Sequence, residues 1–475
     1  MSENFSSVIR ITDINDFITP EQACIIPLKP AEEKDEGQVE IKSRVFVAAP
    51  TKKSTKVAIS LNDCLACNGC ITTAETMLIQ EQSGEKMLEA VPKFAVSVVT
   101  LSPQAVCSVA TKRSLSVPEA TKLIAGYLKS IGIRYVLDSS FARELTLQLS
   151  YEEWREKQEA STSESPLFCS VCPGFVCYAE KTHGKVFEPL MSRIRSPQAI
   201  SGALVKDYLA RILNVRPGEV FHATVMPCFD KKLEASRSEF KIGEDQVAEV
   251  DCVISASELN QLLEGFDLPK EAAAADEAKT NSEPLTWLNA VERGVMRGGS
   301  AEEQETSGGY GEYILRRYLE EHGDAGFTVT RDTKVKNMEI VKVSRDDQVV
   351  FSMAKVYGFR NIQNMVQKLK RKRFPISYVE VMACPAGCSN GGGQVRAETS
   401  EGRQELLAGV NARYATIRRE DREGCCGEGK KKSMKEEVSA VRKEWLQLND
   451  DHERLLKTEF RVVDRNVLGQ AALRW

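Results

Sequence analysis

The stretch Val381–Gln394, VMACPAGCSNGGGQ, contains two cysteines four residues apart and three consecutive glycines, directly after an apolar run. Thiolates bind iron well. Glycine lets the backbone approach an inorganic core closely and direct its N–H groups at sulfide. We therefore interpret this stretch as part of a buried iron-sulfur site at the end of a strand, and it decides the fold that we predict.

The composition indicates a large intracellular protein. A chain of 475 residues predicts two or three lobes, because single cores stop growing near roughly 250–300 residues. A net charge of −4 favours neither nucleic acid nor a membrane surface as a partner. Neither a membrane span nor a signal peptide is recognisable. In a reducing compartment, the 14 cysteines indicate metal or redox chemistry rather than disulfides.

Strand and helix signals alternate through the middle of the chain. Apolar runs predict strands at 94–101, 135–140, 220–226, 251–254, 335–343, 349–356 and 378–382. Periodic stretches predict helices at 118–131, 141–160, 197–213, 310–321 and 361–371. Such alternation favours parallel sheets flanked by helices, with ligands bound at the strand ends. We predict an α/β fold with two lobes of parallel or mixed sheets.

Five segments are expected along the chain. They are an N-terminal arm with a first cluster segment (1–90), a first α/β lobe (91–267), a low-complexity insertion (268–307), a second α/β lobe (308–420) and a helical tail (421–475). The arm contains scattered prolines, and the insertion is rich in Ala, Glu, Lys and Ser with little apolar periodicity.

A CxxCxxC motif is formed by Cys64, Cys67 and Cys70. Three thiolates on a tight loop match three corners of a [4Fe-4S] cube, whereas structural zinc usually uses paired CxxC knuckles. In two-cluster ferredoxins a fourth cysteine follows four residues on, before a proline. Here Ala74 and Glu75 occupy those positions, which predicts a single cluster with a remote fourth ligand.

Two cysteines are candidates for that remote ligand. Cys24 lies on the proline-rich arm, and Cys107 follows the first predicted strand. We favour Cys24, because ligation would give the arm a reason to dock. Cys107 has a helical context that suits a small core residue.

The cysteines of the opening stretch, Cys384 and Cys388, need two further ligands. Cys172 in VCPGF and Cys228 in MPC lie near the ends of predicted strands. Convergence of strand ends would bring the four thiols together. The alternative for each single cysteine is an inert core residue.

Three segments resemble the signature motifs of the iron-only hydrogenases, in the same order over most of residues 90–395: SVCPGF, MPCFDKKLEA and EVMACPAGCSNGGGQ. The CxxCxxC motif and its upstream cysteine narrow the resemblance to the eukaryotic hydrogenase-like proteins of cytosolic iron-sulfur assembly, the nuclear prelamin A recognition factor-like family. LNDCLACNGCIT, TVMPCFDKKLEASR, YGFRNIQN and the terminal RW extend it over nearly the whole chain.

The resemblance implies a hydrogenase-like fold with an N-terminal ferredoxin-like segment and two [4Fe-4S] clusters. The implied ligands of the first cluster are Cys24, Cys64, Cys67 and Cys70. The implied ligands of the second cluster are Cys172, Cys228, Cys384 and Cys388.

Departures from the hydrogenase pattern argue against an enzyme. In the hydrogenases a second cysteine directly precedes the first ligand of this cluster and relays protons. Here that position is Val171, and valine cannot carry a proton. Gln394 is followed by Val395 instead of proline, and Phe175 replaces the usual tryptophan. We predict that the chain does not turn over hydrogen.

Lys231 and Glu234 do match the enzyme pattern, in which the lysine contacts a ligand of the di-iron subsite. Two interpretations remain open. The pair either retains part of that cavity or forms an ion pair that braces the second cluster.

The free C-terminal aromatic, Trp475, is costly to expose without a partner. By resemblance, this tail is a docking peptide for the complex that targets clusters to apoproteins.

The expected function is therefore that of a cytosolic iron-sulfur assembly component. It would link the early scaffold to the late targeting complex with its β-propeller subunit, without direct binding to nucleic acid or membrane. The expected location is the cytoplasm, with the nucleus as a second site. The alternatives are a hydrogenase-type redox enzyme and a prelamin-binding nuclear interaction protein.

Overall fold

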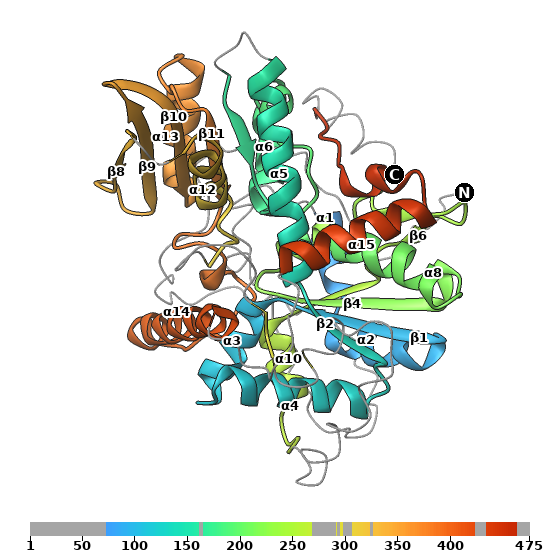
Figure 1. Ribbon diagram of the computed structural model, residues 1–475. Coiled ribbons are helices and arrows are strands. Elements are labelled where there is room, and N and C mark those ends of the chain that lie inside the picture. The colour runs from blue at the N-terminus through green and yellow to red at the C-terminus, as the bar shows by residue number, and fades with distance from the viewer. Residues whose placement is uncertain are drawn as a thin grey trace, which may run out of the picture.

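The computed structural model describes residues 73–160, 165–267, 291, 295–297, 306–323, 326–422 and 434–462. Two main sheets form the centres of two lobes, one below the other in Figure 1. The predicted insertion lies almost entirely outside the described residues.

The first sheet is wholly parallel, in the order β2-β1-β4-β7. Its strands are β1 (Val96–Leu101), β2 (Tyr135–Asp138), β4 (Val220–Met226) and β7 (Cys252–Ser255). All residues of β1, β4 and β7 are buried. Continuous apolar runs of this kind are typical of parallel strands covered on both faces.

Helices cover both faces of the first sheet. One core contains residues of α3 (Pro103–Lys112), α4 (Val117–Ser130), α10 (Ala256–Leu262) and the long α14 (Ser400–Arg422). A second core contains residues of the π-helical segment Leu204–Leu209. A capping box between Ser116 and Glu119 fixes the start of α4.

The second sheet is mixed, in the order β3-β11-β10-β9-β8. Its strands are β3 (Leu167–Cys169), β8 (Thr328–Asp332), β9 (Met338–Arg345), β10 (Gln348–Tyr357) and β11 (Tyr378–Met382). β3, β11 and β10 are mutually parallel, whereas β9 pairs antiparallel with β10 and β8 pairs antiparallel with β9. α6 (Pro173–Phe187), α12 (Tyr310–His322) and α13 (Phe359–Lys370) contribute to its core.

The two lobes are interleaved along the chain. β3 belongs to the second sheet, although it precedes β4 and β7 of the first. α5 (Ser140–Ala160) contributes Phe141 and Leu145 to a core beside the first lobe and Tyr151 and Trp154 to the second. Figure 1 shows α5 running from one sheet to the other. The predicted domain bounds remain a prediction.

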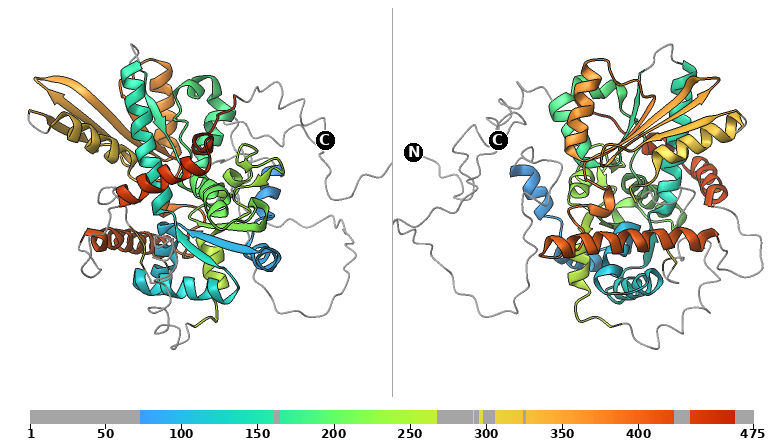
Figure 2. Two further views of the ribbon diagram at one scale, coloured as in Figure 1. Left: turned by 45° about the vertical axis from the view of Figure 1, so that its right-hand side comes forward. Right: turned by 90° about the vertical axis from the view of Figure 1, so that its left-hand side faces the viewer.

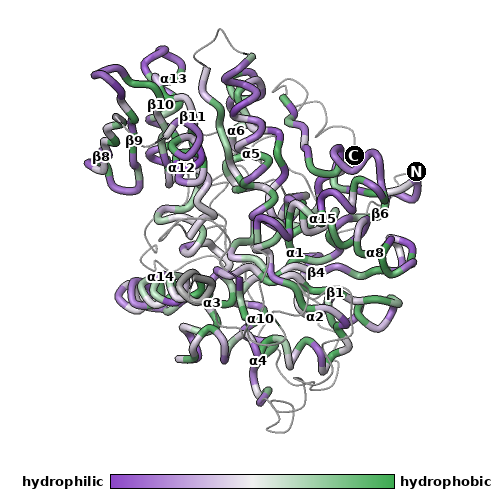
Figure 3. Tube along the Cα trace, in the orientation of Figure 1, coloured by the Kyte–Doolittle hydropathy of each residue, from purple (hydrophilic) through white to green (hydrophobic). Residues whose placement is uncertain are grey.

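The remaining elements complete the layers. They are α1 (Thr73–Gln80), α2 (Gly84–Ala90), α7 (Pro197–Ala203), α8 (Ala210–Ile212), α9 (Asp230–Ala235), β5 (Lys241–Ile242), β6 (Val247–Ala248), α15 (Met434–Leu448) and short 3-10 turns at Val91–Lys93, Glu188–Leu190, Pro217–Glu219, Cys388–Asn390 and His452–Leu456. Figure 2 shows α14 stretched across the first lobe. Figure 3 shows hydrophilic residues along the β8–β9 edge and on α14.

The α/β prediction is confirmed. Two strands have the predicted bounds, 220–226 and 378–382. The helix predicted at 197–213 is present, but its middle is π-helical. α6, α14 and β8 were not predicted. None of the helices in the described ranges is long and apolar enough to cross a membrane.

A buried histidine in β4 makes the stability of the fold dependent on pH. His222 is fully buried, with Nε2 2.9 Å from Thr100 Oγ1 and Nδ1 3.0 Å from the Glu249 carbonyl oxygen. Burial lowers the pKa of His222 from 6.5 to about 3. Below pH 6.5 the unfolded chain therefore binds a proton that the folded chain does not, and stability falls as the pH decreases towards 3.

We expect the free energy of unfolding to fall by about 2 kcal/mol between pH 7 and pH 5 because of His222 alone. The His222→Gln variant should lack this part of the pH dependence. Urea unfolding of the wild-type protein and the variant at pH 7 and pH 5 measures this difference. An equal loss of stability in the two proteins would contradict the role of His222.

Candidate iron-sulfur site

The four cysteines predicted for the second cluster lie at strand ends where the two lobes meet. Cys172 caps the N-terminus of α6, just after β3. Cys228 follows β4 by two residues, and Cys384 follows β11 by two. Cys388 begins a 3-10 turn. One thiol thus comes from the first sheet and three come from the second.

These four side chains lie close enough to influence one another electrostatically. Burial raises the pKa of the Cys384 thiol well above its usual value, and the charges of Cys172, Cys228 and Cys388 raise it further. Burial likewise raises the pKa of Cys228 strongly and that of Cys388 to about 12. Four thiolates packed together repel each other, so a bound cation would stabilise the group.

The N-terminus of α6 supports negative charge on one of these thiols. Burial raises the pKa of Cys172, while N–H groups of Ala383, Phe175 and Gly174 lower it. The Ala383 N–H donates to Cys172 Sγ at 3.4 Å. Helix N-termini stabilise thiolates in this way. Hence the backbone of two segments is arranged around this sulfur.

The glycine run packs closely against a neighbouring loop of the protein, while its predicted approach to an inorganic core stays a prediction. A Cβ on Gly391 would lie 2.3 Å from the Pro227 carbonyl oxygen, and one on Gly393 would lie 3.2 Å from Cys228 Cα. The Gly393 N–H also donates to Pro227 O at 2.9 Å. These two glycines therefore let the loop after Cys388 pack against the loop that carries Cys228.

Enlarging one of these glycines should disturb the site. Gly391→Ala would force backbone against backbone, and we expect a loss of about 1–3 kcal/mol in stability together with reduced iron content. Gly218→Ala is the matched control, because its Cβ would be 3.7 Å from Val247. Thermal unfolding and iron analysis of both variants check this. Equal behaviour would show that the close approach is unimportant.

Lys231 and Glu234 form a buried ion pair beside the cysteines. Lys231 Nζ lies 2.8 and 3.0 Å from the two carboxylate oxygens of Glu234 and 3.0 Å from Ser196 Oγ. Gln198 Nε2 donates to the Lys231 carbonyl oxygen at 2.9 Å. Of the two interpretations left open by the sequence, this geometry favours the brace, because it ties α9 to α7.

The position at which the resemblance to the hydrogenases predicts the loss of a proton relay lies against an apolar core. Val171 is half-buried and packs against the core of the second sheet. Phe175, in place of tryptophan, is fully buried with its ring centroid 5.3 Å from that of Phe187. Neither side chain can exchange a proton.

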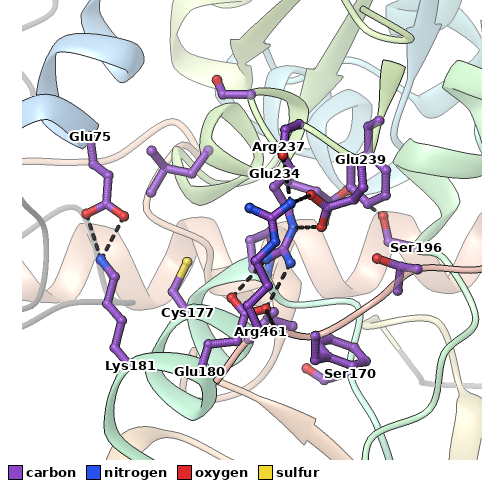
Figure 4. Close-up of a pocket in the computed structure, with 18 of the residues that line it drawn as sticks. Glu75, Ser170, Cys177, Glu180, Lys181, Ser196, Glu234, Arg237, Glu239 and Arg461 are labelled. Atoms are coloured by element: carbon purple, nitrogen blue, oxygen red, sulfur yellow. Dashed lines mark hydrogen bonds and ion pairs between the residues drawn. The ribbon is translucent and has the colours of Figure 1, made fainter. Parts of the chain in front are cut away.

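A pocket of about 370 Å³ adjoins the site (Figure 4). Ser170, Ser196 and Glu234 line it, and so does Cys177. Its charged residues are paired: Lys181 with Glu75 at 2.7 Å, and Arg237 with Glu180 at 2.9 Å and with Glu239 at 2.5 Å. Solvent therefore comes close to the brace without meeting an unpaired charge among these residues.

The other predicted site residues lie outside the described part of the chain: Cys24, Cys64, Cys67, Cys70 and Trp475. Their roles remain predictions. Cys107, the alternative fourth ligand of the first cluster, is fully buried in α3 within the core of the first sheet. Burial raises the pKa of Cys107 to about 12, as expected for a core residue.

All four candidate donors at this site are thiols, which are the usual ligands of iron-sulfur clusters. Among the described residues, no three His, Cys, Asp or Glu side chains are grouped to hold one metal ion. Zinc requires its thiolates at about 2.3 Å from one point. A four-iron cube takes one thiolate at each corner, so its ligands stand further apart. Four thiols brought together from both lobes form a donor set that suits such a cluster.

Sequence reasoning missed three residues around the site. Asp230 is buried and raises the pKa of Cys172, Cys228 and Cys384 after the larger effect of burial. Ser307 Oγ accepts the Cys388 N–H at 3.0 Å, and Lys232 is buried and pairs with Glu258 at 2.8 Å. Asp230 and Lys232 stand in MPCFDKKLEA, but the motif does not show which neighbours they contact.

Comparison with known proteins first defines the class. The family model "Iron only hydrogenase large subunit, C-terminal domain" matches residues 95–392. An apo FeFe-hydrogenase from Chlamydomonas reinhardtii is 19% identical, with a TM-score of 0.59 over 79% of this chain and 98% of that one. The fold is thus that of the iron-only hydrogenases.

Relatives that match this chain over its full length belong to a more specific group of proteins. A probable cytosolic Fe-S cluster assembly factor of Brugia malayi is 45% identical over 99% of this chain and 98% of its own length. One of Caenorhabditis elegans is 44% identical over 99% of both chains. The cytosolic iron-sulfur assembly component 3 of Mus musculus is 40% identical over the full length of both. The chain belongs to this family of cytosolic iron-sulfur assembly components.

Proposed function

We propose that this protein is a component of cytosolic iron-sulfur assembly that holds two [4Fe-4S] clusters. The second cluster would be held by Cys172, Cys228, Cys384 and Cys388, and the first by Cys24, Cys64, Cys67 and Cys70. The observation that carries the proposal is the meeting of four thiols from both lobes, held by backbone N–H groups and an ion-pair brace.

When bound, such a cluster supplies an electron carrier or a transferable iron-sulfur unit. The residues of this chain hold the thiols in place and limit the access of solvent. Cys172 and Cys384 are only 7% and 6% exposed. Burial at this level favours a retained cluster over a freely exchanging one.

The proposed role is to link the early scaffold with the late targeting complex in the cytoplasm. The names of the relatives support a role in cytosolic assembly. The C-terminal Trp475 would dock onto the targeting complex, including its β-propeller subunit. The test uses cells depleted of the endogenous protein and supplied with either the full chain or a chain lacking Trp475.

The full chain should restore the activity of cytosolic iron-sulfur enzymes and co-purify with late assembly proteins. The chain lacking Trp475 should keep its iron but lose most of this co-purification. Full restoration with no associated assembly protein would argue against the linking role.

Hydrogen turnover is the alternative that the fold suggests. Because Val171 cannot relay protons, we expect the anaerobically reconstituted protein to evolve no hydrogen from reduced viologen above a protein-free control. Gas chromatography measures this. Sustained hydrogen evolution would revive the enzyme hypothesis.

A further inference from the structure

The N-terminal end of the described chain is anchored to the helix that follows Cys228. The anchor is Gln82, a half-buried residue just after α1. Its Nε2 donates to the Lys232 carbonyl oxygen at 3.0 Å and to Ser236 Oγ at 3.1 Å. Its Oε1 accepts the Val253 N–H at 3.1 Å. One side chain therefore contacts both α9 and β7.

Lys232 extends these contacts to α10. Its side chain is fully buried, and Nζ donates to the Gln82 carbonyl oxygen at 2.6 Å and to Glu258 Oε1 at 2.8 Å. Glu258 Oε2 in turn accepts the N–H and the hydroxyl of Ser255, each at 2.7 Å. Buried charges that lose a partner are costly. α9, the first turn of α10 and Gln82 therefore hold each other in position.

The same network reaches the glycine run. The Ser257 N–H donates to the Gly393 carbonyl oxygen at 3.0 Å, and a Cβ on Gly393 would lie 2.8 Å from Ser255 Cβ. The first turn of α10 thus sets the position of the loop after Cys388, and α9 sets that of Cys228. These are two of the three loops that carry the four cysteines.

A second anchor joins the N-terminal segment to the helix that Cys172 caps. Glu75 on α1 pairs with Lys181 on α6 at 2.7 Å, shown at the left of Figure 4. In the sequence, Cys70 stands three positions before Thr73, the first residue of α1. The part of the sequence that contains Cys70 therefore leads directly into α1 and Gln82. These contact both α6, the helix after Cys172, and α9, the helix after Cys228.

We propose that Gln82, acting through Lys232 and Glu258, is a positioning residue for the second cluster. It holds the Cys228 loop and the glycine run at the separation that the cluster requires. Retention of this cluster then depends on the contacts that α1 and Gln82 make with α6, α9 and β7. The inference rests on the proposed function, because it assumes a cluster on Cys172, Cys228, Cys384 and Cys388.

The test is made in the full chain with Cys64, Cys67 and Cys70 replaced by alanine, so that the iron counted belongs to the second cluster. Gln82→Ala is compared with Gln148→Ala, a half-buried glutamine whose side chain, among the described residues, bonds to Glu144 of its own helix. Gln82→Met keeps the length of the side chain without its polar atoms and serves as a second variant if Gln82→Ala does not fold.

We expect both Gln82 variants to release iron to a ferrous chelator roughly 10-fold faster than the control. The EPR spectrum of their reduced cluster should shift while that of Gln148→Ala does not. Unchanged release and spectra in the Gln82 variants would overturn the inference alone. If the parent with intact Gln82 holds no cluster, the proposed function fails as well.

Discussion

Replacing Cys384 by alanine should remove about four irons and four sulfides per chain, half of the total expected for two clusters. Cys384 is buried, and the charges of the three other thiols raise its pKa after the larger effect of burial. Three cysteines leave one corner of the cube without a thiolate. Iron and sulfide analysis after anaerobic purification measures the loss, together with the visible absorbance of the cluster.

Cys177→Ala is the matched control. Cys177 lies on α6 five residues after Cys172 and lines the adjacent pocket, but it does not belong to the four. Its replacement should leave the iron content unchanged. If Cys177→Ala lost the iron and Cys384→Ala kept it, the assignment of the ligands would be wrong.

Replacing Lys231 by alanine should destabilise the protein by about 3–5 kcal/mol, because it leaves the Glu234 carboxylate buried without its cation. The side chains of Lys231 and Glu234 are only 10% and 9% exposed. Since the same ammonium also lowers the pKa of Cys228 and Cys388 against the larger effect of burial, the iron content should fall too.

Two further variants distinguish a structural role of Lys231, in the ion pair with Glu234, from a role in binding a ligand. The double variant Lys231→Met with Glu234→Leu removes both charges and should recover most of the stability. Lys86→Ala breaks a pair of the same spacing with Glu89, exposed by 54% and 63%, and should cost at most about 1 kcal/mol. Chemical unfolding under anaerobic conditions measures all of these. If Lys231→Ala kept its full stability but lost its iron, the structural role of the Lys231–Glu234 ion pair would be contradicted.

Elements with a continuous pattern could be predicted from the sequence. β4 and β11 are short runs dominated by apolar residues, with only His222 and Thr224 in β4 and Glu380 in β11 as polar positions, and each is followed by a proline near a cysteine. α6 was missed because Pro173, Gly174 and Gly184 interrupt its pattern. In the structure Pro173 stands at the first helical position, where its missing N–H costs nothing.

The contacts that shape the site could be predicted only in part. The four cysteines could be grouped because strand ends of parallel sheets meet and because the motifs resemble a known family. The contact between Lys232 and Gln82 could not be predicted, because the two residues are 150 positions apart in the sequence. Lys231 and Lys232 are adjacent in sequence, yet successive helical positions face different neighbours. One lysine therefore pairs within α9 and the other pairs outside it.

The neighbours of the glycine run could be predicted only in part, for a related reason. Its composition indicates that something approaches the backbone closely, but not what that is. The inorganic core stays a prediction, and the structure adds the loop of Pro227 and Cys228, which lies against Gly391 and Gly393. Identifying the neighbour required the long-range packing of the two lobes.

The most direct test of the account is a Mössbauer spectrum with iron and sulfide counts on the anaerobically purified full chain. We predict about eight irons and eight sulfides, all as [4Fe-4S] clusters. A variant with Cys172, Cys228, Cys384 and Cys388 all replaced by alanine should retain about four of each. Bound zinc in place of iron, or equal iron content in the two proteins, would contradict the account.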